Sequence, residues 1–360
     1  MTFTKYSYLL VNAQYWNMRN LNNVISQEDL PPSPYDKNRW PWTEQTEGLP
    51  QRMSDGSELP SISIITPSYN QGQFIEETIR SVLLQCYPNL EYIIIDGGST
   101  DNSVEIIKKY DKWITYWVSE PDRGQAHGIN KGLERATGEI LAYLNSDDYY
   151  LPGTLWKVAE HWCQFPQTDL IHGRCRYVNE QGDKIGEQFG NITRFDEIID
   201  LWDVWWKQRQ FVQPEVFWTK RITDKVGLFR EELFYAMDYD YWCRILNGGG
   251  IVGTIKEELS CFRFTSHQKS THKEEVATEL LHIVKPIIWN NQIIGLTKRL
   301  SLKGKWLYHT ILLHQIEKSV ANHDRTLVRW TKVLMIFLSY PEILFAPSFI
   351  RRLLKWFCRK

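Results

Sequence analysis

The sequence predicts an α/β fold with a Rossmann-like, mostly parallel central sheet flanked by helices. Between residues 62 and 148, strand-like apolar runs alternate with runs of helical spacing, the order typical of a parallel sheet with right-handed crossovers. Three of the strand-like runs stop on small polar or acidic residues, at 66–70, 96–101 and 145–148. Because the carboxyl ends of parallel strands line one crevice, we expect these clusters to meet in space. Such a crevice suits a nucleotide and a metal.

The elements follow from the spacing of apolar residues. In the first part, one strand is expected to begin at residue 62 and to stop on the polar segment 66–70, and others are expected at 92–96, 113–118 and 140–144, with helices at 75–83, 104–110 and 124–136. Beyond residue 148 the pattern is mixed, with helices expected at 155–162 and 238–246 and strands at 170–172, 175–178, 215–218, 251–255 and 259–264. From about residue 274 the chain is expected to be helical, basic and aromatic.

The first 60 residues are rich in Asn, Pro and Trp and include the segments 31–34 and 39–42, whose prolines exclude a regular helix. They form either an extended arm that packs its tryptophans on the body or a disordered leader.

Charge is unevenly spread along the chain. The formal net charge is −1, yet from Lys298 onward thirteen Lys and Arg residues face three acidic ones. Nucleic acid is therefore not expected as a partner of the acidic body. The basic, aromatic tail either lies on an anionic membrane surface or forms a plain helical bundle.

The six cysteines are scattered and include no Cys-x-x-Cys pair, which favours a reduced, cytoplasmic compartment. The amino terminus lacks the charged start and apolar run of a signal peptide, so none is expected. No apolar run reaches the roughly 20 residues of a membrane span.

The 145–148 segment, Asn145-Ser146-Asp147-Asp148, places two carboxylates after an expected central strand. Neighbouring carboxylates repel each other unless a cation or hydrogen-bond donors offset their charge. A divalent ion shared with a diphosphate would do so, because Mg2+ and Mn2+ prefer oxygen ligands. The alternative is that both side chains cap the helix near Gly153.

The other two strand ends are similarly ambiguous. The Asp96 carboxylate can accept bonds from a base or ribose, and the 66–70 segment offers hydroxyls and the ring of Tyr69. Equally, the 96–101 segment has ordinary turn and cap chemistry.

The run from Ile62 to Asp148 closely resembles the family 2 glycosyltransferases, which have the GT-A fold. The matching motifs are Thr66-Pro-Ser-Tyr-Asn70, Ile95-Asp-Gly-Gly-Ser-Thr-Asp101, Asp122-Arg-Gly-Gln-Ala-His-Gly-Ile-Asn130, Gly138-Glu-Ile and Leu144-Asn-Ser-Asp-Asp148. The resemblance implies a donor half at 61–150 and an acceptor half at 151–270, between an N-terminal extension at 1–60 and a helical C-terminal region at 271–360.

The resemblance also implies residue roles. Asp147 leads binding of Mn2+ or Mg2+, and His267 lies on a loop that approaches the metal and diphosphate. Asn145 stands where the family often has Asp, so it adds no charge. The implied nucleotide-sugar contacts are Thr66, Pro67, Ser68, Tyr69, Asp96, Ser99, Asp122, Gln125, Asn130, Asn145, Ser146 and Asp147.

Residues 213–218 and 236–244 resemble the acceptor half of the same family. Asp238 falls on the position of the catalytic base, with Met237 in place of the usual preceding acid. Asp148, Gln213 and Asp240 are expected in acceptor or secondary roles. The alternative is that Asp238 and Asp240 only stabilise the start of a helix.

The implied activity is inverting transfer from a nucleotide-diphosphate sugar, with a UDP-sugar favoured, to a saccharide or lipid-linked acceptor in surface polysaccharide or glycolipid synthesis. One alternative is a nucleotidyltransferase, although residues 66–72 lack its Gly-rich basic loop. The other is a non-catalytic nucleotide-sugar-binding protein. A dinucleotide oxidoreductase is disfavoured because Gly-x-Gly-x-x-Gly is absent after the first strand.

Overall fold

The computed structural model describes residues 25–34, 37–46, 49–205, 207–266, 268–312, 333–336, 338–341 and 343. In this part of the chain, nine strands form one sheet in the order β3-β2-β1-β4-β8-β6-β9-β5, with β7 beside β6. The strands are β1 (Ile62–Ser68), β2 (Leu90–Asp96), β3 (Tyr116–Ser119), β4 (Ile140–Tyr143), β5 (Tyr149–Tyr150), β6 (Leu170–Val178), β7 (Lys184–Phe189), β8 (Val216–Thr219) and β9 (Val252–Arg263). The predicted α/β class is confirmed.

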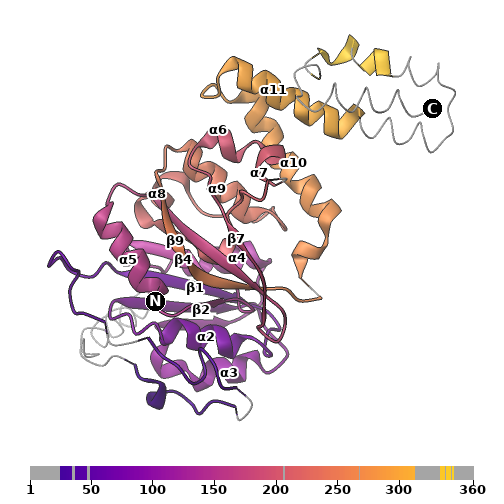
Figure 1. Cartoon of the computed structure of the whole chain (residues 1–360). Coiled ribbons are helices and arrows are strands. Elements are labelled where there is room, and N and C mark those ends of the chain that lie inside the picture. The colour runs from indigo at the N-terminus through magenta and orange to yellow at the C-terminus, as the bar shows by residue number, and fades with distance from the viewer. Residues whose placement is uncertain are drawn as a thin grey trace, which may run out of the picture.

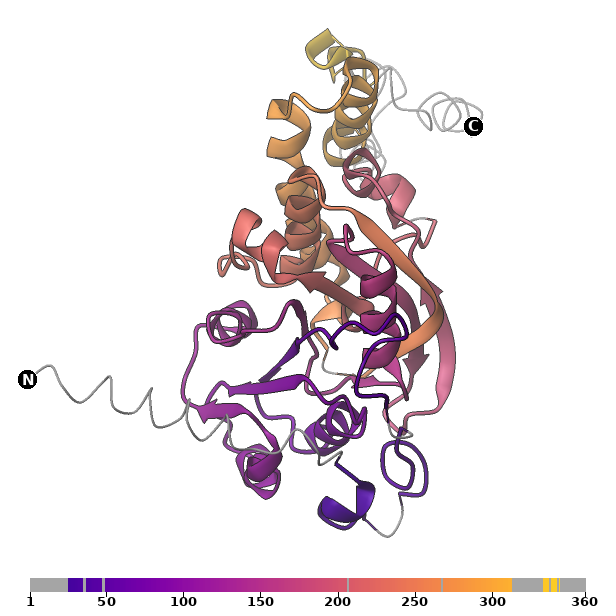
Figure 2. The ribbon, with the colours of Figure 1, turned by 90° about the vertical axis from the view of Figure 1, so that its left-hand side faces the viewer.

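Helices flank both faces of the sheet (Figures 1 and 2). They are α2 (Ile75–Leu83), α3 (Ser103–Lys109), α4 (Gln125–Leu133), α5 (Thr154–Gln164), α6 (Phe195–Ile198), α7 (Leu201–Val204), α8 (Lys220–Val226), α9 (Met237–Asn247), α10 (Lys273–Asn290) and α11 (Leu296–Leu307). Short 3-10 turns occupy Gln27–Asp29, Asp111–Trp113, Gln213–Glu215 and Lys269–Thr271, and a π-helical turn covers Tyr308–Leu312.

The first four strands are parallel and lie within residues 61–150, the segment expected to be the donor half. β1 pairs with β2 on one side and β4 on the other, and β2 pairs with β3. Every residue of β1 is buried, as expected for a parallel strand covered on both faces. α4 lies close to β1 because Gly132 faces Ile65, where a Cβ would come within 2.4 Å of the isoleucine side chain. This packing fixes the strand ends that build the crevice.

The second half departs from the expected elements in three ways. β6 and β9 are each one continuous strand where two were expected, because their polar interruptions continue the parallel β6–β9 ladder through register shifts. β7 was not expected; it is an exposed antiparallel neighbour of β6 with little apolar alternation. β3 begins at Tyr116, because residues Asp111–Trp113 form a 3-10 turn.

The described part of the N-terminal extension is an ordered arm that packs on the body. Trp40 and Trp42 are buried, and the Trp40 indole N–H donates to the Tyr150 carbonyl oxygen at 2.7 Å. From α2, the buried Arg80 donates to the carbonyl oxygens of Pro31 and Pro41 at 2.8 and 3.1 Å and lies over the Trp42 ring. Of the two expectations, the packed arm is therefore the one observed for these residues.

The C-terminal helices project from the end of the molecule opposite α2 and α3 (Figure 1). α11 is tied to the body by Lys298 and Lys305, whose ammonium groups lie 2.9 and 2.7 Å from the buried carboxylate of Asp200. In the ranges that the structure describes, no helix is long and apolar enough to cross a membrane. Most of the basic tail beyond residue 312 lies outside the described residues.

Candidate active site

The three predicted clusters do meet at one edge of the sheet, because Ser68 is in register with Asp96, and β4 lies on the other side of β1. The loops after β1 and β2 are bonded to each other. The Gly97 N–H donates to the Ser68 carbonyl oxygen, the Asn70 N–H to Ser99 Oγ and the Gly72 N–H to Asp101 Oδ2, each at 2.8 Å. The two loops thus form one hydrogen-bonded double loop.

Asp96 organises the second of these loops. Its buried carboxylate accepts bonds from the backbone N–H groups of Gly98 and Ser99 at 3.2 and 2.9 Å. The hydroxyls of Ser99 and Ser119 add bonds at 2.5 and 2.6 Å. The turn interpretation of this segment accounts for these bonds, and a direct bond from Asp96 to a nucleotide would have to share or replace one of them.

The loop after β1 presents a different surface. Thr66 is buried and its hydroxyl lies 3.1 Å from the Tyr92 hydroxyl, and Pro67 is buried beside it. Ser68 is 95% buried, and its Oγ has no hydrogen-bond partner within the described residues. An orphaned buried hydroxyl is rare in a folded protein. The Tyr69 ring, in contrast, is 61% exposed, as a stacking surface must be.

Asp122 and Asn130 belong to the motif that begins α4. The Asp122 carboxylate accepts the Gly124 N–H at 2.8 Å and faces Gly97, where a Cβ would come within 2.8 Å of it. Asn130 bonds both ways to the backbone of Phe229, at 2.9 Å each. A sugar contact from Asn130 would require these bonds to be exchanged.

Asn145 is the centre of a hydrogen-bonded chain of amides that links both halves of the protein. Its Oδ1 accepts from Gln125 Nε2 at 2.6 Å, and its Nδ2 donates to Gln213 Oε1 at 3.1 Å. Gln213 Nε2 donates in turn to the Tyr143 carbonyl oxygen at 2.5 Å. An amide donates and accepts at once, so Asn145 does here what an aspartate could not.

The Asp147–Asp148 turn is held from β9 by Arg263. The Arg263 backbone N–H donates to Asp148 Oδ1 and its Nε to the Asp147 carbonyl oxygen, each at 2.9 Å. The buried guanidinium pairs with Glu77 at 2.7 Å. Neither carboxylate caps α5, whose N-cap is Gly153 with no side-chain bond. The capping alternative is therefore wrong for this pair.

Burial raises the pKa of both carboxyl groups, and for Asp148 the neighbouring Asp147 charge raises the pKa further. Such a pair fits a nearby cation, which would offset the repulsion. Ser146, between Asn145 and Asp147, is buried. Among the described residues no group of three His, Cys, Asp or Glu side chains could hold an ion, and His267 lies outside them.

Asp238 and Asp240 both lie in the first turn of α9 but face different surroundings. Asp240 is buried between Arg230 and Arg244, at 3.1 and 2.8 Å. Asp238 is half-buried and its Oδ1 accepts the Tyr239 N–H at 2.7 Å. Burial, with a smaller contribution from Glu279, raises the pKa of Asp238 to about 6.

Packed rings link α9 to the end of β4. The Trp218 ring lies 6.4 Å from the Tyr143 ring and 5.4 Å from the Trp242 ring of α9, between ring centroids. Burial and then the charges of Asp238 and Asp148 raise the pKa of Tyr143 well above its usual value. Trp242 and Phe217 are buried, as expected for core residues.

Sequence reasoning missed Lys269, which reaches into this crevice from the loop after β9. Its Nζ lies 3.2 Å from Gln125 Oε1 and 3.8 Å from the centre of the Phe234 ring. Burial lowers the pKa of Lys269, while the charges of Glu279 and Asp122 act in the opposite direction. The only sequence signal was its place beside His267.

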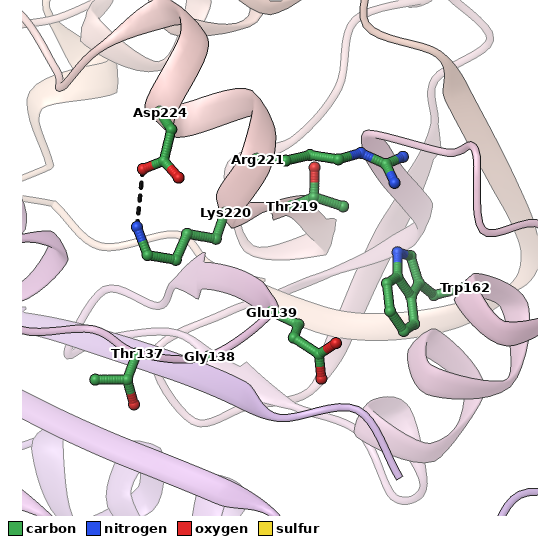
Figure 3. A pocket seen from close by; sticks show the side chains of 8 residues that line it. All are labelled: Thr137, Gly138, Glu139, Trp162, Thr219, Lys220, Arg221 and Asp224. Carbon is green, nitrogen blue, oxygen red and sulfur yellow. Dashed lines mark hydrogen bonds and ion pairs between the residues drawn. The ribbon is translucent and has the colours of Figure 1, made fainter. Parts of the chain in front are cut away.

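A pocket of about 280 Å³ lies at the opposite edge of the sheet, between the start of β4 and the end of β8 (Figure 3). It contains none of the predicted site residues. Its two cations are already paired, Lys220 with Asp224 at 2.8 Å and Arg221 with Asp169 at 2.7 Å. The crevice at the strand carboxyl ends remains the candidate site.

Comparison with known proteins agrees with this geometry. The sequence profile of glycosyl transferase family 2 matches residues 63–227. The putative teichuronic acid biosynthesis glycosyltransferase TuaG of Bacillus subtilis is 43% identical over 104 residues, which cover 28% of this chain and 41% of that protein. An uncharacterized glycosyltransferase of Haemophilus influenzae is 36% identical over 130 residues, 35% of this chain and 52% of that protein. The chain thus spans about half the length of these relatives.

Among solved structures, S. aureus TarS 1–349 in complex with UDP-GlcNAc matches with a TM-score of 0.56 and 17% identity, over 80% of this chain and 82% of that one. A longer TarS structure gives a TM-score of 0.54 and 19% identity, over 70% of this chain and 44% of that one. The fold is therefore of the GT-A type. This fold agrees with the match of residues 63–227 to glycosyl transferase family 2.

Proposed function

We propose that this protein transfers a sugar from a nucleotide-diphosphate sugar to an acceptor hydroxyl with inversion at the anomeric carbon. The observation that carries the proposal is the position of Asp238 in the first turn of α9, a helix that packs through Trp218 against Tyr143 at the end of β4. Its raised pKa of about 6 suits a general base. The donor half at 61–150 and the acceptor half at 151–270 would meet there. The family match supports the reaction class.

In the proposed reaction, Asp238 removes the proton from the acceptor hydroxyl. The oxygen attacks the anomeric carbon from the face opposite the nucleotide, a new glycosidic bond forms, and the bond to the diphosphate breaks. The nucleoside diphosphate leaves with the bonding electron pair, and the proton stays on Asp238 until solvent takes it. Asp240 is a poor base candidate because both of its oxygens face arginines.

A UDP-sugar is the favoured donor, since the TarS structure that shares this fold contains UDP-GlcNAc. The orphaned Ser68 hydroxyl and the exposed Tyr69 ring offer one hydrogen bond and one stacking face to the nucleotide. The rigid bonds around Asp96 keep these two groups in place. Preorganised contacts of this kind lower the entropy cost of binding.

Asp147 would hold Mn2+ or Mg2+ together with the donor diphosphate, with His267 as a further candidate ligand and Asp148 in support. A bound ion would offset charge that grows on the departing diphosphate. Lys269 would act on the same charge, because its ammonium group lies 3.2 Å from Gln125 Oε1, and Gln125 in turn donates to Asn145 Oδ1 at 2.6 Å. Electrostatic stabilisation of a leaving group is often the largest catalytic contribution.

The acceptor would be a saccharide or a lipid-linked saccharide at the cytoplasmic face of a membrane, in surface polysaccharide or glycolipid synthesis. The name of the teichuronic acid relative supports this reading. Leu334, Met335 and Leu338 are exposed by 57 to 71%, beside a strongly basic stretch of sequence. Deleting residues 331–360 should therefore reduce binding to anionic liposomes, and unchanged binding would contradict the membrane contact.

A donor panel tests the function directly. Each nucleotide sugar is mixed with the protein and Mn2+ or Mg2+, and the midpoint of thermal unfolding is measured before turnover is assayed. A true donor should raise the midpoint of thermal unfolding. At one hundred times its Kd, the donor adds about 2.7 kcal/mol to the free energy of unfolding. If no donor stabilises the protein in the presence of metal, the transferase proposal fails.

A further inference from the structure

We propose that Glu279, on the C-terminal helix α10, is a positioning residue that sets the geometry of Asp238. The inference rests on the proposed function, because it takes Asp238 as the base. Glu279 lies more than forty residues further along the chain, outside the part that matches the family. It belongs to the helical region rather than to the sheet that carries the donor site.

The Glu279 carboxylate accepts hydrogen bonds from three successive backbone N–H groups. Glu279 Oε1 accepts the Phe234 N–H at 2.8 Å. Its Oε2 accepts the N–H groups of Tyr235 and Ala236, each at 2.6 Å. One half-buried carboxylate therefore binds three successive backbone donors, and bonds to an ionised acceptor are about twice as strong as neutral ones.

These three donors immediately precede α9. Ala236 is the N-cap of that helix, and no side chain of its own segment caps it. The first N–H groups of a helix need partners from elsewhere, and a negative charge there is favourable. Glu279 supplies both, so the direction in which the Asp238 side chain leaves the first turn depends on a residue of α10.

Lys269 fastens the same segment from the other side. Its Nζ lies 3.4 Å from the Phe234 carbonyl oxygen and over the Phe234 ring. Phe234 is 52% exposed and makes an edge contact with Tyr235. The backbone around Phe234 is thus held between an anion and a cation, and the base follows four residues later.

The pKa of Asp238 reports whether Glu279 is in place, because the charge of Glu279 is one of the contributions to that pKa. Burial and the charge of Glu279 raise the pKa of Asp238, while its bond from the Tyr239 N–H lowers it. The charge of Asp238 contributes to the raised pKa of Tyr143 on β4, and the charge of Glu279 acts against the lowering of the Lys269 pKa by burial. Neutralising Glu279 should therefore lower the pKa of Asp238 and displace its side chain.

The test compares Glu279→Gln with Glu274→Gln in the full-length protein. Glu274 is an exposed acid on the same helix, so its substitution controls for lost charge on α10. We expect Glu279→Gln to lower kcat by about tenfold to a hundredfold, as for a small misplacement of a reacting group. KM for the donor should stay unchanged, and the acidic limb of the pH profile should move to lower pH. Glu274→Gln should change none of these.

The outcome separates positioning from plain stabilisation. A wild-type kcat, or a lower kcat whose acidic limb does not move, overturns the proposal. If Glu279→Gln does not fold, Glu279→Asp carries the test, since it keeps the charge but is too short for all three bonds, and a wild-type kcat in that variant overturns the proposal as well.

The donor function is judged separately. If the wild-type protein transfers no sugar, or if Asp238→Asn transfers at the wild-type rate, the proposed function has failed. If Asp238→Asn is inactive and Glu279→Gln is normal, only the role of Glu279 has failed.

Discussion

The two walls of the crevice are built in different ways. On the proposed donor side, the loops after β1 and β2 are hydrogen-bonded to each other. The bonded residues lie close in sequence, for example Asn70, whose N–H donates to Ser99 Oγ at 2.8 Å. On the acceptor side, the segment before Asp238 is held by Glu279 and Lys269. The donor wall stabilises itself, whereas the acceptor wall depends on a distant segment.

This difference suggests which wall can vary. A double loop held by its own hydrogen bonds depends less on the rest of the chain, so the proposed nucleotide site would be retained while other segments change. The proposed base, if α10 orients it, would respond to changes in that helix. Function carried on rigid elements with variable surroundings is common in enzymes.

The largest effect should come from the acceptor wall. Asp238→Asn is expected to lower the transfer rate by about 10²- to 10⁴-fold, because a general base contributes that much. Protection by the donor should remain at the wild-type level. The matched control is Asp240→Asn, which breaks an ion pair with two arginines and should reduce stability while folded molecules still transfer. Equal transfer losses in both variants would assign Asp238 a structural role.

The same residue gives a pH prediction. With a folded-state pKa of about 6, transfer should fall about tenfold per pH unit below that value. The raised pKa also means that the ionised carboxylate costs folding free energy, a cost that is absent below the unfolded value and complete above about pH 6. Asp238→Asn should therefore raise the unfolding midpoint at pH 7.5 but not at pH 4. A variant less stable than wild type at pH 7.5 would contradict this.

The next effect concerns the Asp147–Asp148 turn, which Arg263 holds. Arg263→Met removes the buried partner of Glu77 and the bond to the Asp147 carbonyl oxygen. Breaking a buried pair costs about 3 to 5 kcal/mol of unfolding free energy, measurable by urea denaturation. The control is Lys220→Met, which breaks an exposed i,i+4 pair and should cost under about 0.5 kcal/mol. Similar costs for the two variants would show that the Arg263 contacts do not stabilise this turn.

The sequence predicted the donor wall well because its signals are local. Apolar runs that end at Ser68, Asp96 and Tyr143 are strands in the structure, and parallel pairing brings their ends together. The bonds that occupy Asp96 and Asn130 could not be predicted, since they depend on loop conformation and on the distant Phe229.

The acceptor wall was predicted only in part. The helix near Asp238 was expected from its apolar spacing and is α9. Glu279 gave no local signal, because an acid in the middle of a helix usually faces solvent. β7 was missed because its side chains are mostly exposed and do not alternate, so burial could not mark it.

A smaller effect is expected at Asp147, the proposed metal ligand. Asp147→Asn should lower kcat by about 10²- to 10³-fold, as for loss of one electrostatic group at a developing charge. It should also abolish the part of donor protection that depends on Mn2+ or Mg2+. Asp183→Asn, at an exposed site, is the matched control. Metal-dependent protection that survives in Asp147→Asn would place the ion elsewhere.

The smallest effect compares two buried serines on β1. Ser68 Oγ has no partner among the described residues, whereas Ser63 Oγ bonds to Glu91 and accepts the Gly138 N–H at 2.8 Å. Ser68→Ala should leave stability unchanged or slightly higher and weaken donor binding by about 0.5 to 1.5 kcal/mol, the net value of one hydrogen bond. Ser63→Ala should do the opposite, lowering stability by leaving buried groups unpaired without changing donor affinity. Calorimetric titration and urea denaturation of both variants measure the two quantities separately. If Ser68→Ala binds the donor as tightly as wild type, the orphaned hydroxyl does not contact the nucleotide, and the donor wall would recognise it by stacking and backbone groups alone.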